Sequence, residues 1–303
     1  MYHGAVELAP RAEGLTVVNL LNVEEYLYSV LPSEMPSGWP QAALQAQAVA
    51  ARSYTLANLG RFAARGFDLL GDVASAAYRG LGAETAAARA AVDATRGLAL
   101  MAEDKPLPAY YSANCGGYTD TTESAWGFPS SLPAVPDPLS PARAALLDPE
   151  QLAAWLSDRP PAYCANPDYS ARSAYRWKLW VSRQEIENRL EHPELGAILA
   201  IVPSVRTLSG RVSEVRVKGA SGELTVRWDA VRRRLGGLRS NLFVVEPQLG
   251  ADGLPESFLF TGAGWGHGVG LCQSGAAGMA AAGWSAERIL RHYYGGASLQ
   301  RLF

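Results

Sequence analysis

The sequence lacks the features that place a chain in several large protein classes. It has no apolar run close to the roughly 20 residues that span a bilayer, so we expect no transmembrane segment in this chain. Its formal net charge is −2, which gives no general attraction to a phosphate backbone, so we expect no nucleic-acid partner. With 303 residues, 48 % of them hydrophobic, the chain is predicted to be globular.

A signal peptide is also missing. The first residues, MYHGAVELAP, have neither the basic start nor the apolar stretch of such a segment. Either the chain is cytoplasmic or an export segment has been left out.

Familiar catalytic and binding motifs are absent too. The glycine-rich stretch GWGHGVG is not followed by the Lys-Ser/Thr of a P-loop, and it lacks the GxGxxG spacing of a dinucleotide site. Because there is no GxSxG elbow, a hydrolase triad of Ser112, His267 and Asp120 would rest on composition alone.

The sequence has only three cysteines, Cys115, Cys164 and Cys272, and no CxxC pair. They are too few for a disulfide framework. Three readings stay open: a closed structural zinc site with His267 as fourth ligand, a disulfide between Cys115 and Cys164, or buried free thiols.

The predicted fold class is α+β, with a helical catalytic core. Residues 15–23 are typical of a strand, and residues 24–31 of a short helix closed by Pro32. An Ala-rich helix is expected after Pro40, and another over residues 84–96.

The second half of the chain is predicted to contain more strands. A β-rich portion is expected at about 175–250, with a hairpin of residues 205–217 and 222–228 around GASG. A Pro-rich excursion at about 128–174 precedes it, and short strands are expected at 98–101 and 109–113. Further helices are expected at residues 149–157, at 183–191 beginning at Ser182, in the stretch after Trp228-Asp229, and at 285–294.

Glu34 lies in PSEMPSGWP, where three prolines argue against regular helix and hold the segment between two helices. Pro32, Met35, Pro36 and Trp39 surround it with apolar groups. Such surroundings raise the pKa of a carboxyl group and suit it to donate a proton to a glycosidic oxygen. The alternative is a helix-terminal glutamate with a capping role.

Two loops could bind a polar polymer. In GWGHGVG, the glycines allow close approach of a ligand, and His267 and Gln273 could bind sugar hydroxyls or orient an acid. Ser112, Asn114 and residues 119–122 offer hydroxyl and amide groups in the second loop. The alternative for the first loop is a tight turn with a buried histidine.

Three segments together resemble the SpoIID/LytB family. They are VNLLNVEEYLYSVLPSEMPSGWPQAALQAQAVAARSYTL, then YYSANCGGYTDTTESAWG, then GWGHGVGLCQSGAAGMAAAGWSAERILRHYYGGASL. They occur in the family's order over residues 17–56, 110–127 and 260–300. Their spacing implies one family domain over residues 1–303.

The resemblance implies a lytic transglycosylase that cleaves the β-1,4 bond between N-acetylmuramic acid and N-acetylglucosamine. Glu34 would be the single general acid/base, because the muramic acid 6-hydroxyl attacks its own anomeric carbon and no second carboxylate is required. The active-site groove would lie between the Glu34 segment and the GWGHGVG loop. The resemblance assigns the groove to these residues: Arg52, Tyr54, Ser112, Gly116, Gly117, His267 and Gln273.

The resemblance also sets expectations about partners. Peptidoglycan glycan strands would be the substrate, a cell-wall amidase a further partner, and the location outside the cytoplasm. No cofactor would be required. Tyr111 stands where many members have His, and Cys115 where they have Ser or Thr, so a metal site of relatives does not transfer. Some members are described as amidase enhancers, which leaves a non-catalytic wall-binding module as the alternative.

Overall fold

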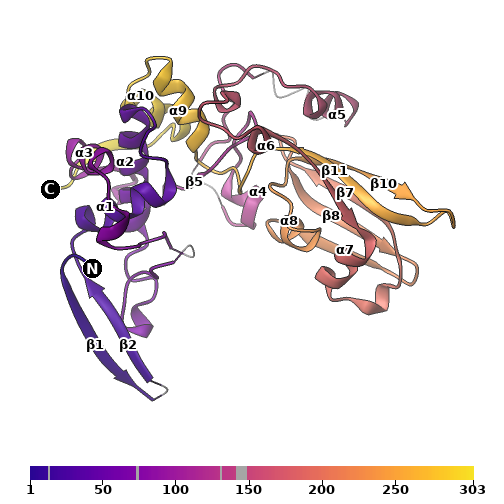
Figure 1. Cartoon of the computed structure of the whole chain (residues 1–303), viewed down its shortest axis with the longest axis horizontal. Coiled ribbons are helices and arrows are strands. Elements are labelled where there is room, and N and C mark those ends of the chain that lie inside the picture. Colours follow the sequence, from indigo (N-terminus) through magenta and orange to yellow (C-terminus); the bar gives the residue numbers. More distant parts are fainter. Residues whose placement is uncertain (13, 73–74, 130–131, 141–148) are drawn as a thin grey trace. The chain divides into compact units, whose positions relative to one another are not determined.

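A computed structural model describes residues 1–12, 14–72, 75–129, 132–140 and 149–303 (Figure 1). The chain forms two compact units. Unit 1 consists of Met1–Tyr110 together with Met279–Phe303, and unit 2 of Tyr111–Gly278. Because helices and several small sheets occur together, the predicted α+β class is confirmed. The assignment of residues 1–303 to one family domain stays a prediction.

Helix α2 (Gln41–Ala57) forms the centre of unit 1. It contacts α1 (Val23–Glu34), α3 (Ala86–Ala94), α10 (Ala286–Tyr293) and strand β3 (Leu98–Ala102). Alanine has the highest helix propensity, and its small side chain lets neighbouring elements approach closely. The Ala-rich sequence therefore gives a helix that can be buried on several sides, as predicted.

Short antiparallel strands complete unit 1. Strand β3 pairs with β13 (Ser298–Arg301) on one side and with β4 (Lys105–Pro106) on the other. Strands β1 (Ala5–Arg11) and β2 (Gly14–Leu20) form a hairpin. Short 3-10 helices lie at Ala63–Arg65 and Leu81–Ala83.

Helix α1 is longer than the sequence pattern indicated. It continues past Pro32 to Glu34, so the expectation that Pro32 closes the helix was wrong. Proline removes only its own backbone donor, so the amides that follow it can still donate in the helical pattern. The Met35 amide still donates to the Leu31 carbonyl at 3.0 Å, and Ser33 Oγ donates to the Ser29 carbonyl. Glu34 thus occupies the last turn of a regular helix.

Two three-stranded antiparallel sheets dominate unit 2 (Figure 1). One has the order β10-β11-β6, and the other β7-β8-β9. Their buried aliphatic and aromatic side chains share one core, which includes Trp177, Val215, Phe243 and Phe258. The strands are β6 (Arg176–Ser182), β7 (Ile198–Arg206), β8 (Val212–Gly219), β9 (Glu223–Arg227), β10 (Phe243–Leu249) and β11 (Pro255–Ala263).

The strand expected at 205–217 is in fact two strands. Strand β7 ends at Arg206 and β8 begins at Val212, with Gly210 between them in the left-handed region at φ 81°. The pattern hid this hairpin because the intervening turn is short. The second hairpin, β8 to β9 around GASG, was predicted correctly. The strand expected at 109–113 shrinks to β5 (Tyr111–Ser112), which pairs in parallel with β12 (Leu271–Cys272).

The remaining elements of unit 2 are short helices. Three match their predicted positions: α5 (Pro149–Ser157), α7 (Arg183–Leu190) with Ser182 as N-cap, and α8 (Ala230–Arg234) directly after Trp228-Asp229. The others are α4 (Thr122–Trp126), 3-10 helices at Tyr163–Ala165 and Pro193–Leu195, and α6 (Arg172–Tyr175). Helix α9 (Gln273–Ala281) begins in unit 2 and ends in unit 1. Of the predicted excursion at 128–174, residues 130–131 and 141–148 lie outside the described part.

Candidate functional sites in the two units

Glu34 is the last residue of α1 and is partly buried. Asn22 caps the start of this helix by accepting the Glu25 amide at 3.0 Å. Leu27, Val30 and Leu31 are fully or almost fully buried, so the helix is anchored along its length. A side chain on the last turn of an anchored helix is held more rigidly than one on a loop.

Tyr26, in the same helix, lies close enough to Glu34 to be affected by its charge. Burial raises the pKa of Tyr26, and the negative charge of Glu34 raises it further. Tyr26 and Tyr78 have ring centroids 5.4 Å apart, and Tyr54 and Tyr110 are 5.6 Å apart edge to face. Burial also raises the pKa of Tyr110. Glu34 therefore lies near the neutral phenol of Tyr26, and Tyr54, predicted to line the groove, also affects Tyr26 electrostatically.

Arg52 is fully buried inside unit 1. Its Nε and Nη2 atoms donate to the two carboxylate oxygens of Glu24 at 2.9 and 2.6 Å. Its Nη1 donates to the Leu98 carbonyl at 3.0 Å. Glu24 also accepts the Gly97 amide, so the pair ties α1, α2 and the start of β3 together. The structure thus gives Arg52 a supporting position in the unit, and a direct role in the groove stays a prediction.

Ser112, Gly116 and Gly117 lie together in unit 2, in and after strand β5. Gly116 has φ 73°, and a Cβ atom there would come within 2.8 Å of the Ala263 backbone. Gly117 has φ 113°, and a Cβ atom would come within 2.9 Å of the Trp155 ring. Both positions therefore require glycine. Ser112 is buried, and its hydroxyl has no hydrogen-bond partner among the described residues.

His267 is partly buried in the GWGHGVG loop. Its ring lies 4.9 Å from the Trp126 ring, and its Nδ1 atom accepts the Val269 amide at 3.0 Å. Burial lowers the pKa of His267 to about 4, with a smaller contribution from the positive charge of Arg232. The imidazole is therefore neutral near pH 7. Gln273 is buried at the first position of α9.

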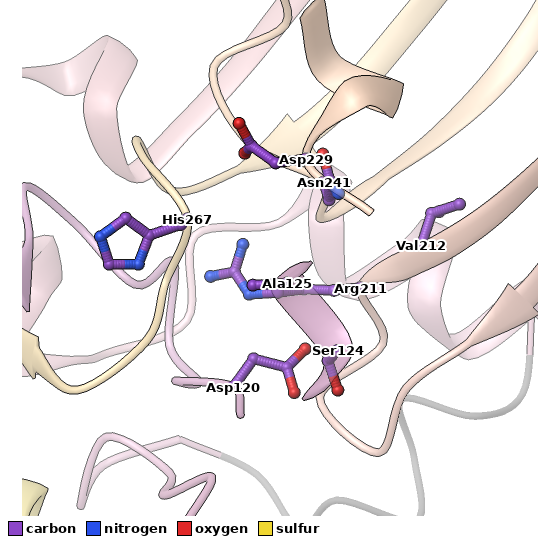
Figure 2. Close-up of a pocket in the computed structure, with 8 residues that line it drawn as sticks. All are labelled: Asp120, Ser124, Ala125, Arg211, Val212, Asp229, Asn241 and His267. Carbon is purple, nitrogen blue, oxygen red and sulfur yellow. The ribbon is translucent and has the colours of Figure 1, made fainter. Parts of the chain in front are cut away.

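A small cavity lies beside His267 (Figure 2). It is lined by Asp120, Ser124, Ala125, Arg211, Val212, Asp229, Asn241 and His267. Its volume of about 10 Å³ leaves room for about one water molecule. Arg211 and Asn241 carry buried polar atoms without a hydrogen-bond partner among the described residues. The cavity suits a bound water and is too small for a sugar ring.

The three cysteines meet inside unit 2. All are buried free thiols, and their Sγ atoms lie within 4.8 Å of one another. They could hold a metal ion. His267 is not part of this group, so the predicted fourth ligand was wrong for the described residues. A protein with this arrangement needs no local CxxC motif, because the fold supplies the proximity.

Comparison with known proteins shows which families parts of the chain resemble. Residues 11–101 match the SpoIID family model, described as Stage II sporulation protein. That match, together with similar proteins named Stage II sporulation protein D, supports a relation to the SpoIID family. Residues 120–270 match a domain of unknown function, DUF8618. The SpoIID match contains Glu34, Arg52 and Tyr54, whereas Ser112, Gly116, Gly117, His267 and Gln273 lie outside it.

Relatives extend the similarity over nearly the whole chain. An uncharacterized protein of Brachyspira hyodysenteriae is 29 % identical over 301 residues, which cover 98 % of this chain and 72 % of that protein. Stage II sporulation protein D of Bacillus amyloliquefaciens is 28 % identical over 298 residues, 93 % of this chain and 75 % of the relative. The Amidase enhancer of Bacillus subtilis is 28 % identical over 305 residues, 90 % of this chain and 40 % of the relative.

The sequence interpretation missed Tyr26 near Glu34. Ending the helix at Pro32 concealed that both residues belong to α1. It also missed the buried Arg176 and Arg211, because arginine is usually exposed and no local pattern marks a buried one. No described helix is long and apolar enough to cross a membrane.

Proposed function

We propose that this protein is a peptidoglycan lytic transglycosylase with Glu34 as its single general acid/base. Its place would be outside the cytoplasm, with glycan strands of the cell wall as substrate. The observation that carries the proposal is the position of Glu34 on the last turn of an anchored helix, near the buried Tyr26, in the region that matches the SpoIID family.

The helix end favours the required protonation state. The macrodipole places partial negative charge at the C-terminal end of α1, which disfavours a carboxylate there and favours the acid. The nearby Tyr26 offers a neutral ring and hydroxyl, because burial and the charge of Glu34 both raise its pKa. Glu24, the buried carboxylate in the same helix, is committed to Arg52.

The proposed reaction has two proton transfers. Glu34 first donates its proton to the glycosidic oxygen while the bond from that oxygen to C1 of N-acetylmuramic acid breaks. The carboxylate of Glu34 then accepts the proton of the 6-hydroxyl as this oxygen bonds to C1. The products are a 1,6-anhydro sugar end and a free 4-hydroxyl, and Glu34 is an acid again. No water is consumed and no second carboxylate acts.

The reaction needs no cofactor. We propose that a zinc ion at Cys115, Cys164 and Cys272 would be structural, since none of the steps above uses a metal. The other groove residues predicted from the resemblance would position the glycan.

A second candidate function is a non-catalytic module that binds cell-wall glycan and stimulates an amidase. It is favoured by the similarity to a relative named Amidase enhancer. Such a module would use the same surfaces but would keep its effect without the Glu34 charge.

Mass spectrometry of the products separates these functions. The purified chain and its Glu34→Gln variant are incubated with glycan strands that carry or lack stem peptides. We expect 1,6-anhydro products from the wild type and a loss of at least about a hundredfold in the variant. Glu25→Gln, a change on the same helix, is the matched control and should keep activity.

Other outcomes would contradict the proposal. Reducing-end products would mean hydrolysis and a second carboxylate. Full turnover by Glu34→Gln would remove Glu34 from the mechanism. No cleavage by the wild type, together with stimulation of an amidase by both proteins, would establish the second function.

A further inference from the structure

The cysteine cluster of unit 2 joins three segments that are far apart in the sequence. Cys115 follows strand β5, Cys164 lies in the 3-10 helix Tyr163–Ala165, and Cys272 ends strand β12. The Sγ atoms of Cys115 and Cys164 are 3.8 Å apart, and all three Sγ atoms lie within 4.8 Å of one another. All three residues are at most 1 % exposed.

We propose that Cys115, Cys164 and Cys272 bind one Zn²⁺ ion as three thiolates. Zn–S bonds of about 2.3 Å in a tetrahedral arrangement place sulfur atoms about 3.8 Å apart, which is the observed separation of Cys115 and Cys164. Thiolates are soft ligands that select Zn²⁺ over Mg²⁺ or Ca²⁺. The described residues supply three ligands, and His267 is not one of them. This inference does not depend on the proposed glycan cleavage.

Two buried arginines flank the cluster. Arg176 donates from Nη1 to the Gly116 carbonyl at 3.0 Å, and Arg211 donates from Nη2 to the Cys115 carbonyl at 2.6 Å. The two guanidinium groups thus hold consecutive carbonyls of the peptide that carries Cys115. They are 6 % and 3 % exposed, so both positive charges lie inside the protein near the thiols.

Neither arginine forms an ion pair with a carboxylate among the described residues. Nη2 of Arg176, and Nε and Nη1 of Arg211, have no hydrogen-bond acceptor there either. The negative charge of Asp120 acts on Arg211, but among the described residues its carboxylate forms no ion pair with Arg211 and is bound by the hydroxyls of Thr207 and Ser209. Two buried guanidinium groups with this little compensation are stabilised by a further negative charge nearby.

A zinc trithiolate supplies that charge. Three thiols release three protons when they bind Zn²⁺, so the resulting centre carries one net negative charge. Backbone amides point to the same state, because Cys272 Sγ accepts the Cys115 amide at 3.1 Å and the Gly275 amide at 3.3 Å. Amide donors of this kind stabilise a metal-bound thiolate. Asp137 fixes the third segment by accepting the Cys164 and Tyr163 amides at 3.0 Å.

Elemental analysis of the full chain purified without chelator tests the site. We expect about one zinc per chain, and three thiols that react with a thiol reagent only after the protein is unfolded with a chelator. Cys164→Ser should lower the bound zinc at least severalfold. Protein refolded with Co²⁺ under reducing conditions should show thiolate-to-cobalt absorption.

Three results would overturn the proposal. A mass two hydrogens low, with no metal, would mean a disulfide between two of the cysteines. Three reduced thiols that take up neither Zn²⁺ nor Co²⁺ would mean buried free cysteines. Copper bound in place of zinc would refute the choice of metal.

A matched pair of variants tests the role of the arginines. Arg176→Gln removes the buried charge next to the cluster, and Lys178→Gln removes an exposed charge from the same strand. We expect the first to weaken zinc binding at least about tenfold and the second to leave it unchanged. Arg176→Lys, which keeps the charge, should restore much of the affinity. Equal affinity in Arg176→Gln and Lys178→Gln would show that the arginine does not compensate the metal centre.

Discussion

The two units bury arginine in different ways. In unit 1, Arg52 is paired with the Glu24 carboxylate through two hydrogen bonds. In unit 2, Arg176 and Arg211 bind backbone carbonyls beside the cysteine cluster and have no carboxylate partner among the described residues. Unit 1 therefore balances the charge with its own side chains, whereas unit 2 would balance it with a metal-bound thiolate centre.

The two units therefore differ in what their buried charges need for stability. The Arg52–Glu24 pair of unit 1 is complete in the folded chain, so the support of Glu34, the proposed acid, needs nothing added. The corresponding support in unit 2 would depend on metal supply and on the oxidation state of three thiols. Changes in chelator or oxidant should therefore affect unit 2 and leave unit 1 largely intact.

The largest effect is expected from breaking the pair in unit 1. Glu24→Gln leaves Arg52 as a buried cation without its counter-charge, and we expect a loss of about 3–5 kcal/mol in the free energy of unfolding. Urea unfolding measures this loss, and hydrogen exchange should place it in α1, α2 and β3.

Glu25→Gln is the control for that variant. Glu25 is the next residue in α1, is less buried, and lies 3.9 Å from His3 in a partly exposed ion pair. Its loss should cost less than about 1 kcal/mol. Similar costs for both variants would mean that the carboxylate is not what allows unit 1 to bury its arginine.

Local patterns in the sequence predicted much of the fold. The Ala-rich helix α2, the Ser182 cap of α7 and the hairpin around GASG depend on residues close together in the chain. The predicted end of α1 was wrong because proline was taken to end the helix, whereas Pro32 removes one donor and the helix continues to Glu34.

The sites depend on contacts that local patterns do not contain. Cys164 and Cys272 lie 49 and 157 residues after Cys115 in the chain, so the tertiary fold brings the three cysteines together. The pairing of Arg52 with Glu24, 28 residues away, has the same origin. Residue types and a family resemblance could single out Glu34 and the cysteines, but whether Glu34 is catalytic stays a prediction.

A smaller effect is expected from pH on His267, a partly buried residue of unit 2. Burial lowers its pKa from 6.5 to about 4, so between these values the unfolded chain binds a proton that the folded chain does not. The stability from the neutral imidazole is thus present above pH 6.5 and lost as the pH falls toward 4. Because His267 is partly exposed, we expect about 1–2 kcal/mol.

Unfolding curves of the wild type and His267→Gln over this pH range measure that contribution. The wild type should lose more stability than the variant as the pH falls. Asp137, whose pKa burial raises to about 6, has the opposite dependence in both proteins and cancels in the difference. Parallel pH curves would mean that the unfolded and folded chains protonate His267 alike.

The smallest effect is expected from Tyr26, with Tyr28 as its comparison. Both tyrosines belong to α1, but their hydroxyls differ in hydrogen bonding. Tyr28 donates to the Asp93 carboxylate at 2.6 Å, whereas the buried Tyr26 hydroxyl has no hydrogen-bond partner among the described residues. Tyr28→Phe should cost about 1–2 kcal/mol, because it removes a bond to a charged group. Tyr26→Phe removes the same atom without losing a protein bond, so it should change stability by less than about 0.5 kcal/mol. Urea unfolding of both variants measures this, and a large cost for Tyr26→Phe would reveal a bound water or other partner for its hydroxyl beside Glu34.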